Sequence, residues 1–541
     1  MKADLTRDTF DPLKHFTRVV MQQGRVQLDA DWNEQASILL HYLQTLAADL
    51  IGPHGGPGVG FEITGSTPAS HLIHDFVIRG GRYYVDGVLC ELSATAVPAT
   101  VVKLPDAPAV VELHVPGTFV DGLEFRKDQY IELFTGPALP PVTAPPGLAK
   151  IGAVDLARNV LTIPASAAVD APVWIRRATT YTTQPDLPSA VTGLGDGSYV
   201  VYLDVWERHL TSVEDDTIAE VALAGPDTAT RAKTVWQVKA VEFAFDGTPN
   251  REAVEARLRG PEFRNRGGLR ARAHDPSPSL TACIVPPDSA YRGAENQLYR
   301  VEIHTSGRPW NPASDLDKVT PHPATFKWSR ENGSVVFPIV GGGGTATVQV
   351  ETLGRDDRFG LAENDWVEVQ DDDSVLNRVV GPLLQVQKID GDMNVTLRGT
   401  PDARIGGNPA KHPLLRRWDL AASKLTHSER DGAVPIVESN DTWLELEQGV
   451  QIQFAPIADP ATVYQTGDYW LIPARTATGD VEWPTEHGTD GAGHAVDVPV
   501  AVPPAGVEHH YAPLAVVTIG AGGGITSLTP FRLTIEPVAK P

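Results

Sequence analysis

The sequence predicts a mainly β protein, built from several small β-sandwich or barrel-like domains that follow one N-terminal amphipathic helix. Short segments in which apolar and polar residues alternate recur along most of the chain, which is typical of strands. The 49 glycines and 45 prolines are spread between these segments, where they act as turn residues. No repeat of fixed period is present, which disfavours a propeller or a β-helix.

The predicted helix begins near Asp31 and ends before Gly52 and Pro53. Asp31 is a favourable N-cap, and Glu34 follows three residues later, the spacing of a capping box. Glycine accepts the left-handed turn that ends many helices, and proline cannot continue one. Steps of four and three residues alternate along the apolar face, as in a heptad repeat, and this face comprises Trp32, Ala36, Leu39, Leu43, Leu46 and Leu50.

Two interpretations of this apolar face stay open. In the first, the six residues form an assembly interface, through self-association or insertion into a partner's groove, and Trp32, Leu39, Leu43 and Leu46 contribute most. In the second, the helix packs on its own domain, as most protein helices do. A stretch of about two and a half heptads does not distinguish the two interpretations.

The chain of 541 residues is long enough for about three to four domains. The glycine-rich segment 52–60 and the proline-rich segment 136–147 are expected to be linkers or exposed loops. The predicted domains are an N-terminal arm with the helix (1–60), a β domain (61–190), a β-rich domain (191–320), a small barrel-like domain (321–405) and a C-terminal β domain (406–541).

Two dipeptides predict hairpin turns. Asp86-Gly87 lies within the alternating segment DFVIRGGRYYVDGVLCEL (75–92), and Asn332-Gly333 lies between two strand-like segments of residues 324–340. Asp-Gly and Asn-Gly are favoured in two-residue hairpin turns because both turn residues need a positive φ angle. Each dipeptide is therefore expected to join two neighbouring strands of one sheet.

The formal net charge of −23 limits the classes of partner. A nucleic-acid-binding protein must neutralise phosphates with Lys and Arg, and an anionic membrane surface also attracts basic residues. We therefore expect neither nucleic acid nor an inserted membrane segment. The excess of acid favours solubility at the high local density of an assembly.

The two cysteines, Cys90 and Cys283, lie in apolar strand-like runs and are expected to be buried free thiols. Two cysteines cannot supply a structural zinc site by themselves. The amino terminus has no apolar core of a signal peptide, and no run approaches the roughly 20 apolar residues of a membrane span. The expected location is the cytoplasm.

Motifs of common catalytic sites are absent: the sequence contains no Gly-x-Ser-x-Gly, HExxH or phosphate loop. Glu508 to Tyr511, with His487 and His494 upstream, could supply a histidine-ligated metal site, but adjacent strand residues point to opposite faces. Asp371, Asp372 and Asp373 resemble a calcium-binding turn, yet they lack its alternating ligands, so a solvated acidic turn is favoured. We expect no catalytic residue, metal or cofactor.

Two weaker patterns leave other functions open. Carboxylates near one strand could form the acid pair of a glycoside hydrolase, and these are Asp204, Glu207, Asp215 and Asp216. Tryptophans in or beside strands either bind a surface glycan or a partner protein, or fill the cores of the β domains, which is the favoured interpretation. They are Trp206, Trp236, Trp310, Trp328, Trp366, Trp418, Trp443, Trp470 and Trp483.

Six blocks of sequence resemble an uncharacterised family, a domain of unknown function, found in gene neighbourhoods of phage tail-like contractile injection systems. The blocks are GRVQLDADWNEQ (24–35), YLDVWERHLT (202–211), GPDTATRAKTVWQV (225–238), FKWSRENGSV (326–335), GDYWLIPARTATGDVEWP (467–484) and GVEHHYAPLAVV (506–517). The resemblance spans nearly the whole chain and supplies no catalytic residues. It implies that the N-terminal block is an attachment module.

The expected function is therefore that of a structural or attachment component of such a particle, in the form of a baseplate-associated, fibre or spike-type protein. Its expected partners are other particle proteins and further copies of itself, with a trimer favoured over a hexamer. The alternatives are a cargo effector or carbohydrate-active hydrolase carried by the particle, and a carbohydrate-binding surface module.

Overall fold

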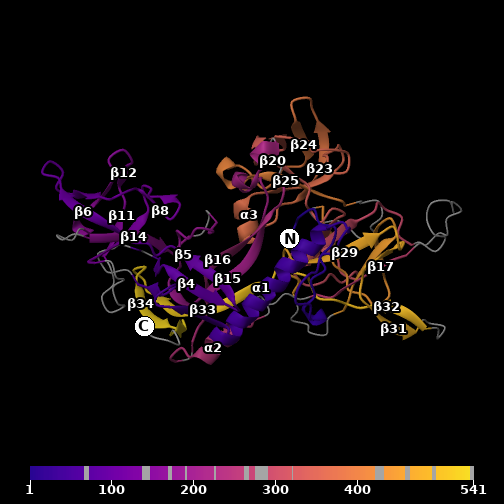
Figure 1. Ribbon diagram of the computed structural model, residues 1–541, viewed down its shortest axis with the longest axis horizontal. Helices are drawn as coiled ribbons and strands as arrows, with labels where there is room; N and C mark the ends of the chain where they lie inside the picture. The colour runs from indigo at the N-terminus through magenta and orange to yellow at the C-terminus, as the bar shows by residue number, and fades with distance from the viewer. Residues whose placement is uncertain are drawn as a thin grey trace. The chain divides into compact units, whose positions relative to one another are not determined.

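A computed structural model describes most of the chain. The residues outside the description are 66–71, 73, 137–146, 168–172, 189–191, 224–226, 246, 261–262, 264–266, 275–289, 320, 421–431, 457–462, 490–494 and 537–541. The described residues form many small sheets and one long helix, α1 (Asp29–Ile51), so the predicted mainly β fold with an N-terminal helix is confirmed (Figure 1).

Contacts between residues divide the chain into two compact units. Unit 1 comprises Met1–His41, Glu207–Lys233 and Arg259–Glu508, and unit 2 comprises Tyr42–Trp206, Thr234–Leu258 and His509–Pro541. Each unit is thus assembled from segments that are distant in the sequence. The five consecutive domains inferred from the sequence stay a prediction, because these units group residues by contact alone.

Unit 1 contains the sheet β26-β19-β18-β29-β30, the sheet β17-β28-β27, the pair β31-β32 and a closed barrel β20-β21-β24-β23-β22-β25. The bounds of the sheets are β17 (Leu269–Ala273), β18 (Gln297–Thr305), β19 (Thr325–Ser329), β26 (Val434–Pro435), β27 (Leu444–Glu447), β28 (Val450–Phe454), β29 (Tyr469–Arg475), β30 (Asp480–Val481), β31 (Thr485–Thr489) and β32 (Ala495–Pro499). The barrel consists of β20 (Val336–Gly341), β21 (Thr347–Val350), β22 (Trp366–Gln370), β23 (Leu383–Ile389), β24 (Asn394–Arg398) and β25 (Leu414–Trp418), with helix α3 (Asp372–Asn377) after β22. The closing strand β25 lies beyond the predicted domain boundary at residue 405.

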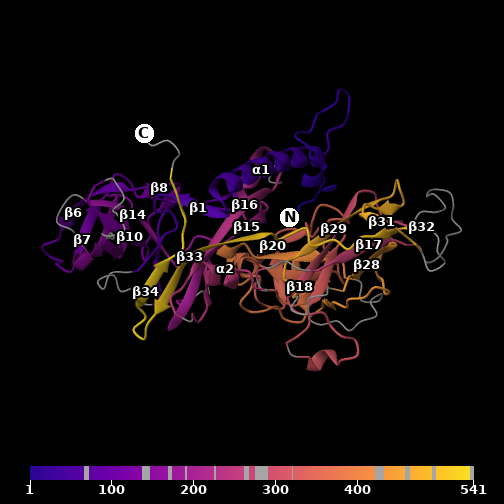
Figure 2. The ribbon, with the colours of Figure 1, turned by 90° about the horizontal axis from the view of Figure 1, so that it is seen from below.

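Unit 2 contains most of the sheet β16-β15-β33-β34, and the two views show these strands side by side (Figures 1 and 2). They are β15 (Gly197–Leu210), β16 (Arg231–Glu242), β33 (His509–Ile519) and β34 (Ile525–Pro530), and helix α2 (Arg251–Leu258) contacts β33. A second sheet consists of β1 (His54–Pro57), β4 (Gly81–Val85), β5 (Val88–Leu92) and β35 (Thr534–Ile535). The largest sheet is formed by β2 (Ile63–Thr64), β3 (Val77–Ile78), β6 (Val97–Lys103), β7 (Val110–His114), β10 (Tyr130–Phe134), β11 (Gly147–Lys150), β12 (Ala153–Asp155), β13 (Val160–Pro164) and β14 (Val173–Thr180), and a separate pair by β8 (Phe119–Val120) and β9 (Leu123–Glu124).

At one point on the edge strand β16, a side chain takes the place of a neighbouring strand. The Gln184 amide nitrogen donates to the carbonyl oxygen of Val238 at 2.9 Å, and the Gln184 amide oxygen accepts from the Val238 backbone nitrogen at 2.5 Å. The backbone groups of an edge strand otherwise stay available for pairing with another chain. Gln184 therefore satisfies both backbone groups of Val238 on this edge.

The two predicted turns have different outcomes. Asp86 and Gly87 both have positive φ and join β4 to β5 as a hairpin, so this prediction is confirmed. Asn332 and Gly333 also have positive φ, but β19 before them pairs with β18 and β26, whereas β20 after them belongs to the barrel. The predicted hairpin at Asn332 is therefore wrong.

The reason lies in the Asn332 side chain, which is buried. Its amide nitrogen donates to the carbonyl oxygens of Met1 at 3.0 Å and Ala3 at 2.8 Å, and its amide oxygen accepts from Arg300 at 3.3 Å. These contacts with distant parts of unit 1 hold the turn at a junction, where the chain leaves the sheet and enters the barrel.

The sheet that contains β18 has a charged face that is nevertheless buried. Along β18, Tyr299, Val301 and Ile303 belong to the main hydrophobic core of unit 1, and alternation places Arg300 and Glu302 on the opposite face. Both charged residues are buried, and Arg300 Nε donates to Glu302 Oε2 at 2.6 Å.

Barrel residues meet the same charged face. Lys327 of β19 donates from Nζ to Oε2 of Glu368 on β22 at 2.6 Å, and the indole nitrogen of Trp418 on β25 donates to the same oxygen at 3.0 Å. Lys327 Nζ also lies 3.6 Å from Glu302 Oε1. Loss of one partner of such a buried ion pair is costly, because it leaves an uncompensated charge in the interior.

Candidate assembly interface

The long helix α1 begins two residues before the predicted start. Asp31 stands at the third helical position, where its Oδ2 accepts from the backbone nitrogen of Leu28 at 3.1 Å. Glu34 accepts from the Thr9 hydroxyl at 2.7 Å. The predicted N-cap at Asp31 with Glu34 as its capping-box partner is therefore wrong, because Asp31 itself reaches back to the residue before the helix.

The predicted end of α1 is confirmed. Gly52 has a φ of +91°, and its backbone nitrogen donates to the carbonyl oxygen of Ala48 at 2.8 Å. This is the left-handed residue that commonly follows a helix. Pro53 comes next and lacks the backbone N–H needed to continue the helix.

One side of α1 packs on the protein. Ala30 and Ile38 are buried, Ile38 with only 1% of its surface exposed. Within unit 2, the backbone of α1 also comes very close to the β4–β5 turn, since a Cβ atom on Gly87 would lie 2.0 Å from the carbonyl oxygen of Gln44. Only glycine fits at position 87, both for this contact and for its positive φ.

The predicted apolar face of α1 lies on the other side and is exposed. At about 100° per residue, its six residues fall within about 80° of the helix circumference, and Ala30 and Ile38 lie roughly 120° to 160° away from its centre. Ala36 is exposed. The other five have between 55% and 78% of their surface exposed, and they are Trp32, Leu39, Leu43, Leu46 and Leu50. Two flanking residues that the heptad pattern leaves out, Leu40 and Tyr42, are also exposed.

We call this exposed face the α1 stripe, defined as Trp32, Ala36, Leu39, Leu43, Leu46 and Leu50. An uncovered row of large apolar residues is unusual on a protein surface and is typical of interaction sites. The structure thus places the six residues together on one accessible face. Their role as an assembly interface stays a prediction.

Two of the four strand carboxylates, Asp204 and Asp215, have partners that shift their pKa away from that of a glycosidase acid. Asp204 is buried, with Oδ1 2.6 Å from His509 Nδ1 and Oδ2 2.6 Å from Lys239 Nζ. Burial alone would raise the pKa of Asp204, but His509 and Lys239 together lower it to about 2. Hydrogen bonds from Thr217 lower the pKa of Asp215. A glycosidase needs an acid whose pKa is raised, and these two carboxylates are shifted the other way.

The described histidines proposed as metal ligands each contact a different carboxylate. These contacts are His487 with Asp497, His509 with Asp204 and His510 with Asp86. His494 lies outside the described residues, as does Cys283, whereas Cys90 is a buried free thiol. Across the described part of the chain, no three His, Cys, Asp or Glu side chains gather as metal ligands.

The three consecutive aspartates lie at the start of helix α3 instead of in a solvated turn. Asp371 is buried, accepts from the backbone nitrogen of Ser374 at 2.8 Å and begins α3 as its N-cap. Asp372 lies 2.7 Å from His412 Nδ1, and Asp373 lies 3.1 Å from Lys411 Nζ. The interpretation as a solvated acidic turn is therefore wrong, because each carboxylate has a defined partner.

None of the nine strand tryptophans is fully exposed on the surface. Five are buried, namely Trp206, Trp236, Trp328, Trp418 and Trp470, and the other four are partly buried. The exposed tryptophan of this chain is Trp32 on α1. The carbohydrate-binding alternative stays a prediction, without the exposed aromatic residues that suggested it.

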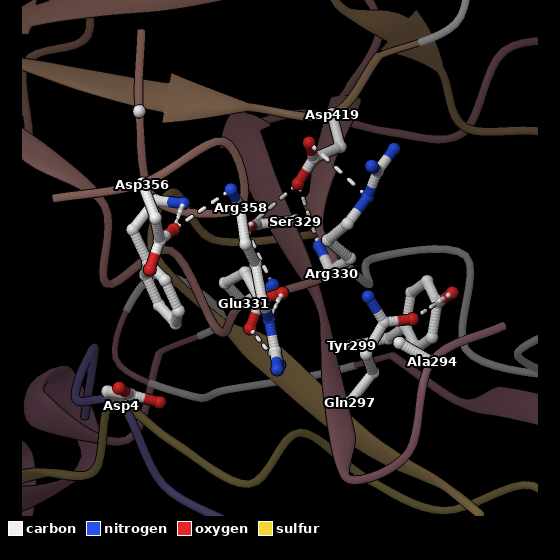
Figure 3. A network of polar contacts seen from close by, with 12 residues as sticks. Asp4, Ala294, Gln297, Tyr299, Ser329, Arg330, Glu331, Asp356, Arg358 and Asp419 are labelled. Atoms are coloured by element: carbon white, nitrogen blue, oxygen red, sulfur yellow. Dashed lines mark hydrogen bonds and ion pairs between the residues drawn. The ribbon is translucent and has the colours of Figure 1, made fainter. Parts of the chain in front are cut away.

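The block FKWSRENGSV forms a polar network around the junction between sheet and barrel (Figure 3). Arg358 donates to Glu331 twice, from Nε at 2.6 Å and from Nη2 at 2.7 Å. The Ser329 hydroxyl donates to Asp419 at 3.3 Å and accepts from the Glu331 backbone nitrogen at 3.2 Å. Arg330 also donates its backbone N–H to Asp419 at 2.9 Å. The network therefore holds the chain in place, and the Ser329 hydroxyl has a structural role in it.

Comparison of the sequence with models of protein families matches a family of unknown function (DUF6519) over residues 1–126, 173–260 and 252–524. These ranges cover most of the chain and contain all six sequence blocks. Searches of the curated proteins and of the solved structures return no match. Among the described residues, no helix has the length and apolar composition needed to cross a membrane.

Proposed function

Because this chain belongs to the DUF6519 family of unknown function, we propose its function from its own surface. We propose that it is a structural attachment component of a contractile phage tail-like injection particle, as a baseplate-associated, fibre or spike-type protein. The sequence blocks that resemble proteins from such gene neighbourhoods support the assignment to this kind of particle. The α1 stripe supports attachment and is the observation that carries the proposal.

The chemistry of the α1 stripe defines its partner. Between Trp32 and Leu50 the stripe is about 27 Å long and contains no charged side chain. Leucines at heptad spacing fit the grooves of another helix, so the partner is an apolar helix of another particle protein. Full burial of one leucine side chain contributes about 1.5–3 kcal/mol, and several leucines together offset the cost of association.

Point substitutions test this proposal better than removal of the N-terminal arm. Residues before α1 are part of unit 1: Lys2 Nζ lies 3.1 Å from Glu302, and the carbonyl oxygen of Thr6 accepts from Arg475 at 2.9 Å. A truncation would therefore disturb the buried network of unit 1. Substitution of exposed leucines leaves these contacts in place.

The test compares particles purified from cells that produce both the particle and a tagged full-length chain. We expect the wild type to co-purify with the particle and Leu39→Asp/Leu46→Asp to be lost from it, because two aspartates in the stripe would be buried without partners. The matched control is Asn33→Asp/Thr45→Asp, which adds the same charge to exposed positions of the same helix. It should co-purify like the wild type.

Circular dichroism and unfolding midpoints establish that both variants are folded. Recovery of Leu39→Asp/Leu46→Asp with the particle at the wild-type level would refute the role of the stripe. A wild-type chain that never co-purifies with the particle would refute the proposed function itself.

A further inference from the structure

The segment between the first residues and α1 is exposed along nearly its whole length and has few contacts with the rest of the chain. We call residues 12–28 the basic arm. On one side of it Thr9 donates to Glu34, and within it the Val19 backbone nitrogen donates to Gln35 at 2.9 Å. Every residue of the arm except Val19 is exposed. Figure 2 shows the arm as an indigo loop that projects away from α1.

Large apolar side chains are concentrated in this arm. Single exposed apolar residues are normal, but several within 17 consecutive residues are typical of a binding segment. The exposed fraction reaches 85% for Val26, and the set comprises Leu13, Phe16, Val20, Met21, Val26 and Leu28. Apart from the contact of Val19 with Gln35, short-range turns order the described segment, such as the one at Gly24 with a φ of +73°.

The charge of the basic arm is opposite to that of the rest of the chain. Residues 12–28 contain Lys14, Arg18 and Arg25 and no Asp or Glu. Removing these three positive charges from the formal net charge of −23 leaves −26 on the remaining residues. Within the described part of the chain, none of the three cations forms an ion pair.

We propose that the basic arm docks on the acidic surface of a second copy of this chain. The charge pattern favours this occupant: the arm is basic, and the rest of a neighbouring copy, with a formal charge of −26, supplies acidic groups that attract it. The exposed apolar side chains of the arm then become buried in the contact. This inference concerns the purified chain alone and stands apart from the particle assignment.

Salt dependence distinguishes this contact from an apolar one. The Debye length falls from about 10 Å at 0.1 M salt to about 3 Å at 1 M, so arm docking weakens as salt is added. Association through the uncharged α1 stripe would not weaken in this way. Sedimentation equilibrium of the full-length wild type and of the arm variant described next should therefore show a larger difference in self-association between the two proteins in 0.1 M salt than in 1 M salt.

The variant Lys14→Glu/Arg18→Glu/Arg25→Glu tests the arm directly. We expect its self-association in 0.1 M salt to be weaker than that of the wild type by on the order of tenfold or more. The matched control is Arg126→Glu/Lys127→Glu/Lys388→Glu, which makes the same charge change at exposed positions outside the arm. The control should remain within about twofold of the wild type.

A second variant addresses the apolar part of the contact. Val20→Ser/Val26→Ser changes two exposed side chains without changing the charge of the arm and should also weaken self-association, whatever the effect of salt. Three outcomes would overturn the proposal: a wild type that is monomeric in 0.1 M salt, self-association that is equal in the arm variant and the control, or arm-dependent binding to phosphatidylserine vesicles by a monomeric chain.

Discussion

Replacement of Lys327 by methionine should destabilise unit 1 through the carboxylate that it leaves behind. Lys327 and Glu368 are each 1% exposed, and their Nζ and Oε2 atoms are 2.6 Å apart. Without Lys327, the described contact left to Glu368 Oε2 is the indole N–H of Trp418. Removing one partner of a buried ion pair costs about 3–5 kcal/mol of unfolding free energy.

The opposite substitution should cost less. In Glu368→Gln, Lys327 keeps a carboxylate 3.6 Å away, that of Glu302, so we expect a loss of about 1–3 kcal/mol. The double variant Lys327→Met/Glu368→Gln leaves neither charge uncompensated and should lie within about 2 kcal/mol of the wild type. The four proteins form a double-mutant cycle with a coupling energy of at least about 2 kcal/mol.

Urea unfolding followed by tryptophan fluorescence measures all four proteins, since Trp418 hydrogen-bonds to Glu368. Burial alone would raise the pKa of Glu368, but Lys327 and other nearby cations lower it. The pair therefore stabilises the fold above the usual glutamate pKa of about 4.3 and loses this effect as the pH falls through the lowered value. Losses that simply add in the double variant would refute this account.

Two further substitutions test other features. Burial raises the pKa of Asp468 to about 8, so the folded state keeps a proton that the unfolded state loses near pH 4, and wild-type stability should fall as the pH rises from about 4 to about 8. In Asp468→Asn this decline should be smaller in pH-dependent unfolding curves, and an unchanged curve would refute the assignment. Gly52→Ala should cost about 1–2 kcal/mol of unfolding free energy, because the position has a positive φ. Gly87→Ala should cost far more. Its position also has a positive φ, and a Cβ there would lie 2.0 Å from the Gln44 carbonyl oxygen. Equal unfolding free energies of the two glycine variants would contradict this close approach.

The sequence predicts those features that depend on neighbouring residues. The end of α1 at Gly52 and the Asp86-Gly87 hairpin follow from the φ angles that glycine allows, and both are confirmed. The start of α1 differs from the prediction because the sequence does not reveal that the Asp31 side chain accepts from the backbone nitrogen of Leu28. The turn at Asn332 was misinterpreted because its amide binds carbonyl groups from the other end of the chain.

The burial of charged side chains could not be predicted from the sequence either. Alternation along β18 correctly separates Arg300 and Glu302 from Val301, but such a pattern normally indicates a solvated face. Only the structure shows that both side chains are buried and that barrel residues meet this face. For the α1 stripe the pattern predicted which residues share a face, whereas which side of the helix packs on the protein needed the structure.

The side chain of Gln184 has a consequence for how copies of this chain can join. A sheet edge that offers free backbone groups can grow by adding identical strands, and such growth has no natural end. At Val238 the glutamine amide already occupies both groups, so another strand cannot pair there without displacing it. Open-ended stacking through this position is thereby blocked, which favours assemblies of fixed size.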